Sequence, residues 1–137
     1  WETVVAAAMD VSLNDDGGIV VHDVAIALNA GTIVNPAIAK SQVQGAYHYG
    51  LCAALYGEIE IQDGQTIPGN FDRQPVLRMN EAPLVRVQLV ASSESPGGVG
   101  ELPTSIAAPA LTNAIFAAGG KRIRELPLRR AGYKLKT

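Results

Sequence analysis

A turn between two β-branched segments constrains the fold of this chain more than any other sequence feature. Residues 3–13 and 18–28 are rich in valine and isoleucine, and residues 14–18, which read Asn-Asp-Asp-Gly-Gly, separate them. Turn residues of this kind between two strand-forming segments are typical of a β-hairpin. The sequence therefore predicts that the two segments pair as antiparallel strands. The acidic turn lacks the regularly spaced oxygen ligands and the closing glutamate of a calcium-binding loop, so no calcium site is expected there.

A long helix is predicted after the hairpin. Asn35 followed by Pro36 is typical of an N-cap and the first residue of a helix, which we expect to cover residues 36–55. This helix contains Gly45 and Gly50, and each glycine costs about 1 kcal/mol relative to alanine in a helix interior. Two such residues in one helix indicate that something approaches its backbone closely.

The remaining elements are shorter and less regular. Residues 58–61 and 84–90 are expected to be strands, the second because apolar and polar residues alternate along it. The Pro-punctuated residues 66–83 are predicted to be an ordered loop, and the small apolar residues 103–118 a second helix that ends at a Gly-Gly pair. Residues 123–128 are expected to add a final edge strand, limited by its proline. Helices and strands alternate without a regular βαβ rhythm, so the predicted class is α+β, with a mixed β-sheet and two main helices.

Length and composition fit one globular domain without an electrostatic footprint for nucleic acid. The chain has 137 residues, is 18% charged and carries a formal net charge of −2, which provides no broad basic surface. Its one basic cluster, residues 121–136, is interpreted as a solvated tail or a subunit-contact strip. No apolar segment approaches the roughly 20 residues of a membrane span.

The segment that carries the most chemistry is residues 95–105. Gly97, Gly98 and Gly100 directly precede Glu101, just before a predicted helix. Glycines allow backbone angles that other residues avoid and the close approach of a ligand. Glu101 is either a general base that abstracts a proton from a bound group or a cap of the helix that follows, and the spacing alone favours neither. A phosphate cradle is a weaker interpretation, because the Lys-Ser or Lys-Thr pair of a P-loop is missing.

A second candidate site lies on the first predicted helix. Gln42 and Gly45 are three residues apart and share a helix face, so a side-chain amide lies beside bare backbone. A carboxamide both donates and accepts hydrogen bonds, which suits a polar heterocycle or an oxo group. A packing role for Gln42 at a crowded helix interface is an equally open alternative.

The histidines and the single cysteine do not indicate a metal site. His22, His48 and Cys52 are not paired at metal-ligand spacing, so we interpret the histidines as surface or packed residues. Cys52 lies among Leu51, Ala53 and Ala54 and is expected to be a small buried hydrophobe. A single cysteine also excludes an internal disulfide.

These segments together resemble the C-terminal part of the molybdopterin-binding large subunit of the xanthine dehydrogenase/aldehyde oxidase family, of the isoquinoline 1-oxidoreductase β-subunit type. Seven ordered blocks that span nearly the whole chain carry the resemblance: residues 29–36 (NAGTIVNP), 42–46 (QVQGA), 50–58 (GLCAALYGE), 70–71 (NF), 77–83 (LRMNEAP), 97–101 (GGVGE) and 108–128 (APALTNAIFAAGGKRIRELPL). The resemblance, with a start that lacks an initiator methionine, leads us to expect that residues 1–137 are a C-terminal fragment of a molybdopterin-binding domain.

The resemblance implies roles for individual residues. The glutamate of the family's Gly-x-Gly-Glu motif, which matches Glu101, takes a proton from a hydroxide bound to molybdenum. Gln42 matches a glutamine that hydrogen-bonds the cofactor. The loop that lines the cofactor site matches Gly97, Gly98, Val99 and Gly100. The implied reaction is hydroxylation of N-heteroaromatic compounds or aldehydes, with water as the oxygen source.

The resemblance also implies cofactors and partners. The intact enzyme is expected to hold molybdenum on molybdopterin in its cytosine dinucleotide form, and to pass electrons to [2Fe-2S] clusters on a small partner subunit. The partners implied are the remainder of the large subunit, that small subunit and a cytochrome acceptor, in a periplasmic or cytoplasmic location. The 137-residue chain alone is expected to bind no cofactor and to be inactive.

Three positions depart from the family pattern. Asn29 stands where an aspartate is usual, residues 44–46 (QGA) replace a commoner Glu-Gly-Gly, and Leu102 separates Glu101 from the following proline. These departures motivate an alternative function, a binding or assembly domain that keeps the fold without molybdenum. None of them changes the proposed base.

Overall fold

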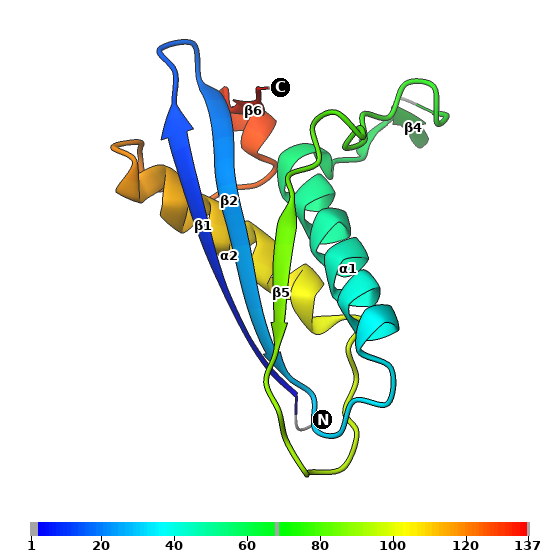
Figure 1. Cartoon of the computed structure of the whole chain (residues 1–137). Helices are drawn as coiled ribbons and strands as arrows, with labels where there is room; N and C mark the ends of the chain where they lie inside the picture. The colour runs from blue at the N-terminus through cyan, green and yellow to red at the C-terminus, as the bar shows by residue number, and fades with distance from the viewer. Residues whose placement is uncertain (1–2, 68, 137) are drawn as a thin grey trace.

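The computed structural model describes residues 3–67 and 69–136. The predicted hairpin is confirmed: strands β1 (Val4–Leu13) and β2 (Gly18–Asn29) pair antiparallel, with one bulge between Asp10 and Val11. Gly17 in the connecting turn has a φ of +76°, which favours glycine. The two strands form the long twisted ribbon of Figure 1. The first two residues of the chain, and position 68 of the predicted loop, lie outside the described residues.

The main sheet is mixed, as predicted. Strand β5 (Val85–Leu89) pairs in parallel with residues 24–28 of β2, and the short strand β6 (Lys134–Leu135) pairs in parallel with residues 18–19. Both therefore lie along the edge of β2 that β1 leaves free. The α+β class is confirmed, and a parallel partner for β2 requires the crossover that the long helix provides.

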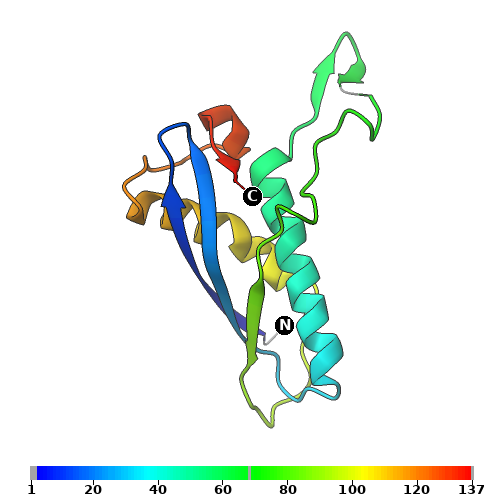
Figure 2. The same ribbon diagram turned by 45° about the horizontal axis from the view of Figure 1, so that its top comes forward.

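Both predicted helices are present, within one residue of their expected bounds. Helix α1 (Pro36–Tyr56) begins at the N-cap Asn35, whose side chain accepts a hydrogen bond from the Ile38 amide. Helix α2 (Leu102–Ala117) crosses behind β1 and β2, while α1 lies alongside β5 (Figures 1 and 2). In the part of the chain that the structure describes, no helix is long and apolar enough to cross a membrane.

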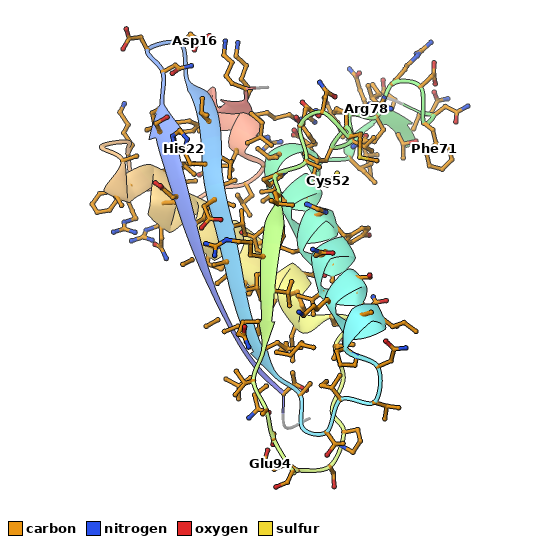
Figure 3. The ribbon with its side chains drawn as sticks, viewed as in Figure 1. Asp16, His22, Cys52, Phe71, Arg78 and Glu94 are labelled. Atoms are coloured by element: carbon orange, nitrogen blue, oxygen red, sulfur yellow. The ribbon has the colours of Figure 1, made fainter. Side chains whose placement is uncertain are left out.

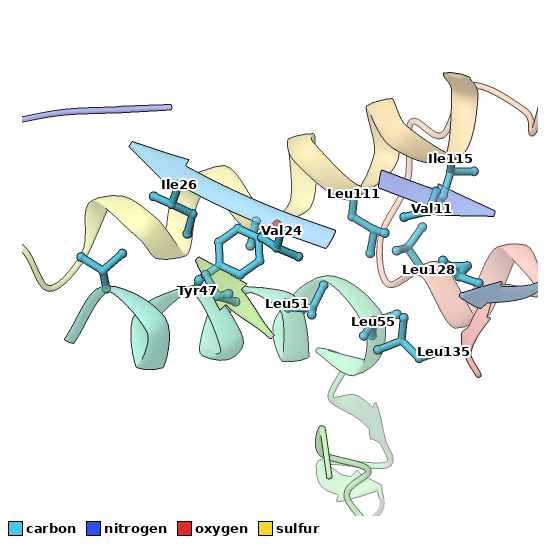
Figure 4. Close-up of a cluster of buried hydrophobic side chains, with 14 of the residues drawn as sticks. Val11, Val24, Ile26, Tyr47, Leu51, Leu55, Leu111, Ile115, Leu128 and Leu135 are labelled. Atoms are coloured by element: carbon cyan, nitrogen blue, oxygen red, sulfur yellow. The ribbon is translucent and has the colours of Figure 1, made fainter. Parts of the chain in front are cut away.

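The core fills the space between the sheet and the two helices (Figure 4). Its fully buried side chains include Ile26, Tyr47, Leu51 and Leu111. Burial raises the pKa of the Tyr47 hydroxyl to about 12, and among the described residues this hydroxyl is the one buried side-chain oxygen or nitrogen without a hydrogen-bond partner. Both helices therefore contribute side chains to one core, Tyr47 and Leu51 from α1 and Leu111 from α2.

A small arm projects from the end of α1 (Figure 2). The predicted strand at residues 58–61 is β3 (Glu60–Gln62), and it pairs with β4 (Gln65–Ile67), which lies at the start of the segment expected to be a loop. At the base of the arm, Arg130 and Arg129 form ion pairs with Glu58 and hold the pKa of that carboxyl below its usual value. Part of the basic cluster thus secures the arm rather than forming a solvated tail.

The prediction of a final edge strand at residues 123–128 is wrong. Residues 123–127 have no regular structure, and the chain then forms the 3-10 helix η1 (Leu128–Ala131) before β6. Leu128 is fully buried in the core, and Pro127 cannot donate to a sheet. Anchoring of the leucine and loss of a donor together favour the short helix over a strand.

Candidate active site

The glycine-rich loop before α2 is bound to the ends of both hairpin strands. The Gly97 amide donates to the Ala30 carbonyl at 2.8 Å, and the Thr3 hydroxyl donates to the Gly98 carbonyl at 2.9 Å. Thr3 is buried, and a Cβ on Gly97 would lie only 2.4 Å from its Oγ1. Close approach to Thr3 therefore requires glycine at position 97.

The positive φ angles that glycine allows do not occur at the three glycines of this loop. The described glycines with positive φ lie elsewhere in the chain, and Gly97, Gly98 and Gly100 are not among them. Their small size matters instead: Gly97 makes room for a protein side chain, while Val99 packs against the core. The loop is thus a well-anchored segment that presents residue 101.

Glu101 is exposed and occupies the N-cap position of α2, but its side chain makes no capping hydrogen bond. Only its main-chain carbonyl takes part in the first turn, by accepting from the Thr104 amide at 3.0 Å. The interpretation of Glu101 as a side-chain cap is therefore not supported by the geometry. Its carboxylate is free to interact with a bound group, beside the positive end of the helix dipole.

The structure brings Gln42 to this loop. Gln42 is exposed on α1, and its Nε2 lies 3.8 Å from the position that a Cβ on Gly100 would occupy. Helix α1 thus contributes a carboxamide, while the loop before α2 contributes bare backbone and the carboxylate of Glu101. Gly45 shares the exposed side of α1 with Gln42, but no atom lies within 4 Å of its Cβ position.

A direct contact between the helices fixes this arrangement. The Thr104 hydroxyl donates to the Ala46 carbonyl at 3.0 Å, and a Cβ on Gly50 would lie 2.2 Å from the Thr104 carbonyl oxygen. Thr104 lies one helical turn after Glu101, and Ala46 lies one turn after Gln42. The helix crossing therefore holds the two candidate site residues in register.

An open hollow of about 540 Å³ lies beside the carboxylate and is lined by Gly98, Gly100, Glu101, Leu102 and Ser105. The open backbone at Gly100 and the Glu101 carboxylate, which makes no capping hydrogen bond, fit a polar cofactor, with the Gln42 amide close by. Such a group would meet the donor and acceptor of the Gln42 amide and the acceptor oxygens of the carboxylate.

The other candidate ligands lie apart from the hollow. His22, on the hairpin, hydrogen-bonds Ser12 at 2.9 Å, and His48 on α1 hydrogen-bonds the Pro83 carbonyl at 2.9 Å. Figure 3 shows His22 and Cys52 on different elements. Over residues 3–67 and 69–136, no group of three or more His, Cys, Asp or Glu side chains could hold a metal ion. Cys52 is only half-buried and accepts a hydrogen bond from the Leu77 amide, which corrects the expectation of a fully buried residue.

Two contacts that position the candidate site, those of Thr3 and Thr104, are not predicted from the sequence. Each threonine bonds a carbonyl that is distant in sequence, so no local pattern signals it. Two of the positions that depart from the family pattern also make defined bonds. Asn29 accepts from the Gly31 amide at 3.1 Å, and Gln44 donates to the Val85 carbonyl at 2.8 Å, a donation that an ionised glutamate could not make.

Comparison with known proteins identifies the family of this chain. A family model described as the molybdopterin cofactor-binding domain matches residues 3–83. The membrane-bound aldehyde dehydrogenase (pyrroloquinoline-quinone) of Gluconacetobacter polyoxogenes is 36% identical over 132 residues, which are 96% of this chain and 17% of that protein. Isoquinoline 1-oxidoreductase subunit beta of Brevundimonas diminuta is 32% identical over 133 residues, again 96% and 17%.

Solved structures share the fold at lower identity. CO dehydrogenase from Oligotropha carboxidovorans superposes with a TM-score of 0.67 at 24% identity, over 76% of this chain and 14% of that one. Quinoline 2-oxidoreductase from Pseudomonas putida 86 gives 0.65 at 21% identity, over 83% and 16%. The family model covers more than half of the sequence. The chain therefore belongs to the molybdopterin cofactor-binding domain family, and its resemblance to the large subunits of the xanthine dehydrogenase/aldehyde oxidase family is confirmed.

Proposed function

We propose that this chain is the part of a molybdenum-dependent oxidoreductase that supplies the general base, Glu101. The observation that carries the proposal is the position of this carboxylate, exposed at the edge of the hollow, at a helix N-terminus and without a capping bond. A base must be free to reach the proton that it abstracts. Family membership supports molybdopterin as the group that it faces.

In the proposed mechanism, the residues of this chain bind the cofactor and move one proton. When bound, the molybdenum cofactor supplies the two-electron redox chemistry that allows oxygen from water to enter the substrate. Gln42 hydrogen-bonds the cofactor through its amide, while the loop of Gly97, Gly98, Val99 and Gly100 lines its site. Glu101 accepts the proton at a carboxylate oxygen, and the adjacent helix N-terminus stabilises the ionised form that does so.

The finer assignments follow the names of the relatives. Those names include an aldehyde dehydrogenase and an isoquinoline 1-oxidoreductase, which supports aldehydes or N-heteroaromatic compounds as the substrate class. We propose the cytosine dinucleotide form of molybdopterin, a small [2Fe-2S] subunit and a cytochrome acceptor. One relative is named for pyrroloquinoline quinone instead. Measuring the molybdenum content of the full-length subunit therefore decides which cofactor it holds.

The test is the substitution Glu101→Gln in the full-length subunit, produced with its partners in a host that makes molybdenum cofactor. Turnover should fall at least about 100-fold, the lower end of general-base contributions, while the molybdenum content per subunit stays unchanged. Glu94→Gln is the matched control, because Glu94 is exposed in the same connection between β5 and α2. Near-normal turnover of Glu101→Gln would overturn the role of this residue.

Metal content also decides between the two candidate functions. About one molybdenum per large subunit supports the oxidoreductase, whereas a folded full-length subunit without molybdenum supports the binding or assembly domain. We further propose that the 137-residue chain alone binds no cofactor and is inactive, because it spans only 17% of the length of these two relatives. Stoichiometric molybdenum in the purified chain would contradict this.

A further inference from the structure

The outward side of α1 carries an exposed stripe without a charged side chain. Ile38, Gln42, Gly45 and Tyr49, which we call the outer stripe, follow one another at spacings of four, three and four residues and are all exposed, so they lie on one helix face. Ile38 is 67% exposed and Tyr49 is 73% exposed. Soluble helices normally place charged residues on such a face.

No described residue packs against the position that a side chain at Gly45 would occupy. A helix-interior glycine costs about 1 kcal/mol relative to alanine, and at Gly50 the contact with Thr104 explains it. At Gly45 no atom lies within 4 Å of the Cβ position. Glycine therefore lowers the stability of the helix at position 45, and no contact among the described residues explains why a larger residue is not used there.

A groove of about 370 Å³ runs beside the stripe, lined by Gly45, His48, Tyr49 and Cys52 of α1 and by Leu77, Arg78, Met79 and Ala82 of the loop before β5. Hydrogen bonds between α1 and this loop hold the walls in place. They join His48 to Pro83, Leu77 to Cys52, and Tyr56 to Glu81. Met79 is 93% exposed at the rim of the groove. Figure 3 shows Cys52 and Arg78 near the end of α1 from which the arm projects. Arg78 is the one Arg, Lys, Asp or Glu residue in this lining.

We propose that this groove and the part of the outer stripe from Gly45 to Tyr49 bind another segment of the same large subunit, an uncharged segment that comes into contact with the backbone at Gly45. The family relatives support this occupant, because 96% of this chain matches only 17% of each of the first two relatives. The rest of such a subunit is a partner of the required size, and the apolar lining selects an apolar segment. The inference rests on the proposed function only in treating the chain as part of a large subunit.

The cofactor is the competing occupant, because Gln42 belongs to the same stripe. Hydroxyl-radical footprinting of the full-length subunit separates the two. We would compare subunit from a host that makes molybdenum cofactor with subunit from a host that does not, and read the oxidation of Tyr49 and Met79 by mass spectrometry. The same peptides after complete proteolysis serve as the unprotected reference.

The expected result is at least about tenfold protection of both residues in both preparations, since side chains that are exposed in this chain become buried against protein. Protection only with cofactor would overturn the inference in favour of the cofactor, and high reactivity in both preparations would overturn it entirely. The footprint of the cofactor-free subunit decides whether a protein segment covers the groove. The role of Glu101 as a general base is tested separately, by the turnover of Glu101→Gln.

A variant of the subunit tests the contact at the glycine. Gly45→Leu should increase the oxidation of Tyr49 several-fold, because the added side chain holds the bound segment away from the helix. Ala37→Leu, at an exposed position of α1 outside the stripe, should leave it unchanged. If Gly45→Leu does not yield folded subunit, the wild-type footprint still decides. Equal reactivity of Tyr49 in the two folded variants would contradict contact at Gly45.

Discussion

The two glycines within α1 lie in opposite environments. Gly50 is buried, and its backbone touches Thr104 at the start of α2, whereas Gly45 is exposed with no neighbouring atom near its Cβ position. The sequence predicts a close approach to this helix, and the structure contains it at Gly50 only. The difference teaches that Gly50 is needed for packing between α1 and α2, whereas the loss of helix stability at Gly45 is not explained by the described residues.

The packed side of the helix is also the one that organises the site. Thr104 contacts α1 at Ala46 and Gly50, and it is one turn from Glu101 as Ala46 is one turn from Gln42. A shift of the crossing would therefore move the candidate base relative to the candidate cofactor ligand. Substitutions at the two glycines should have effects of opposite sign, which is the sharpest test of the comparison.

The largest effect is expected for Gly50→Ala. A Cβ at this position would lie 2.2 Å from a main-chain oxygen, so the helices must move apart, and overpacking of this kind costs about 1–3 kcal/mol. We expect a loss near the upper end of that range in urea unfolding of the chain, despite the better helix propensity of alanine. Stabilisation by Gly50→Ala would show that the helix contact tolerates a methyl group and would break the comparison.

A smaller effect is expected for Thr104→Val, which keeps the shape of the side chain but removes its donor to the Ala46 carbonyl. The free energy of unfolding should fall by about 1 kcal/mol, the typical net contribution of one hydrogen bond. Thr104→Ser retains the hydroxyl and should recover most of this loss. Equal stability of the valine and serine variants, measured by urea unfolding, would mean that the hydrogen bond does not hold the crossing.

Local signals in the sequence predict much of this fold. The turn at residues 14–18 and the Asn35-Pro36 pair define the hairpin and the start of α1, because turn and capping chemistry act within a few residues. The prediction of an edge strand at residues 123–128 was wrong, because the burial of Leu128 is a tertiary effect that overrides local strand propensity.

The candidate site was predicted less completely, for a related reason. Glu101 and Gln42 stand out by residue type and by family resemblance, and the structure places Gln42 beside the loop that presents Glu101. The residues that hold that loop and the helix crossing, Thr3 and Thr104, act on carbonyls 95 and 58 residues away. A threonine at such a distance gives no periodic or motif signal, so its role emerges only from the folded chain.

The smallest effect, and the one of opposite sign, is expected for Gly45→Ala. In the chain described here the added methyl group meets no atom within 4 Å, so alanine should raise the free energy of unfolding by about 0.5–1 kcal/mol through reduced freedom of the unfolded backbone. In the full-length subunit the same methyl group should clash with the segment proposed to cover the groove, and the melting temperature should fall instead. Thermal and urea unfolding of both forms measure the two signs directly. Stabilisation in both forms would mean that nothing approaches Gly45 in the subunit, and the two glycines would then differ only in whether α2 covers them.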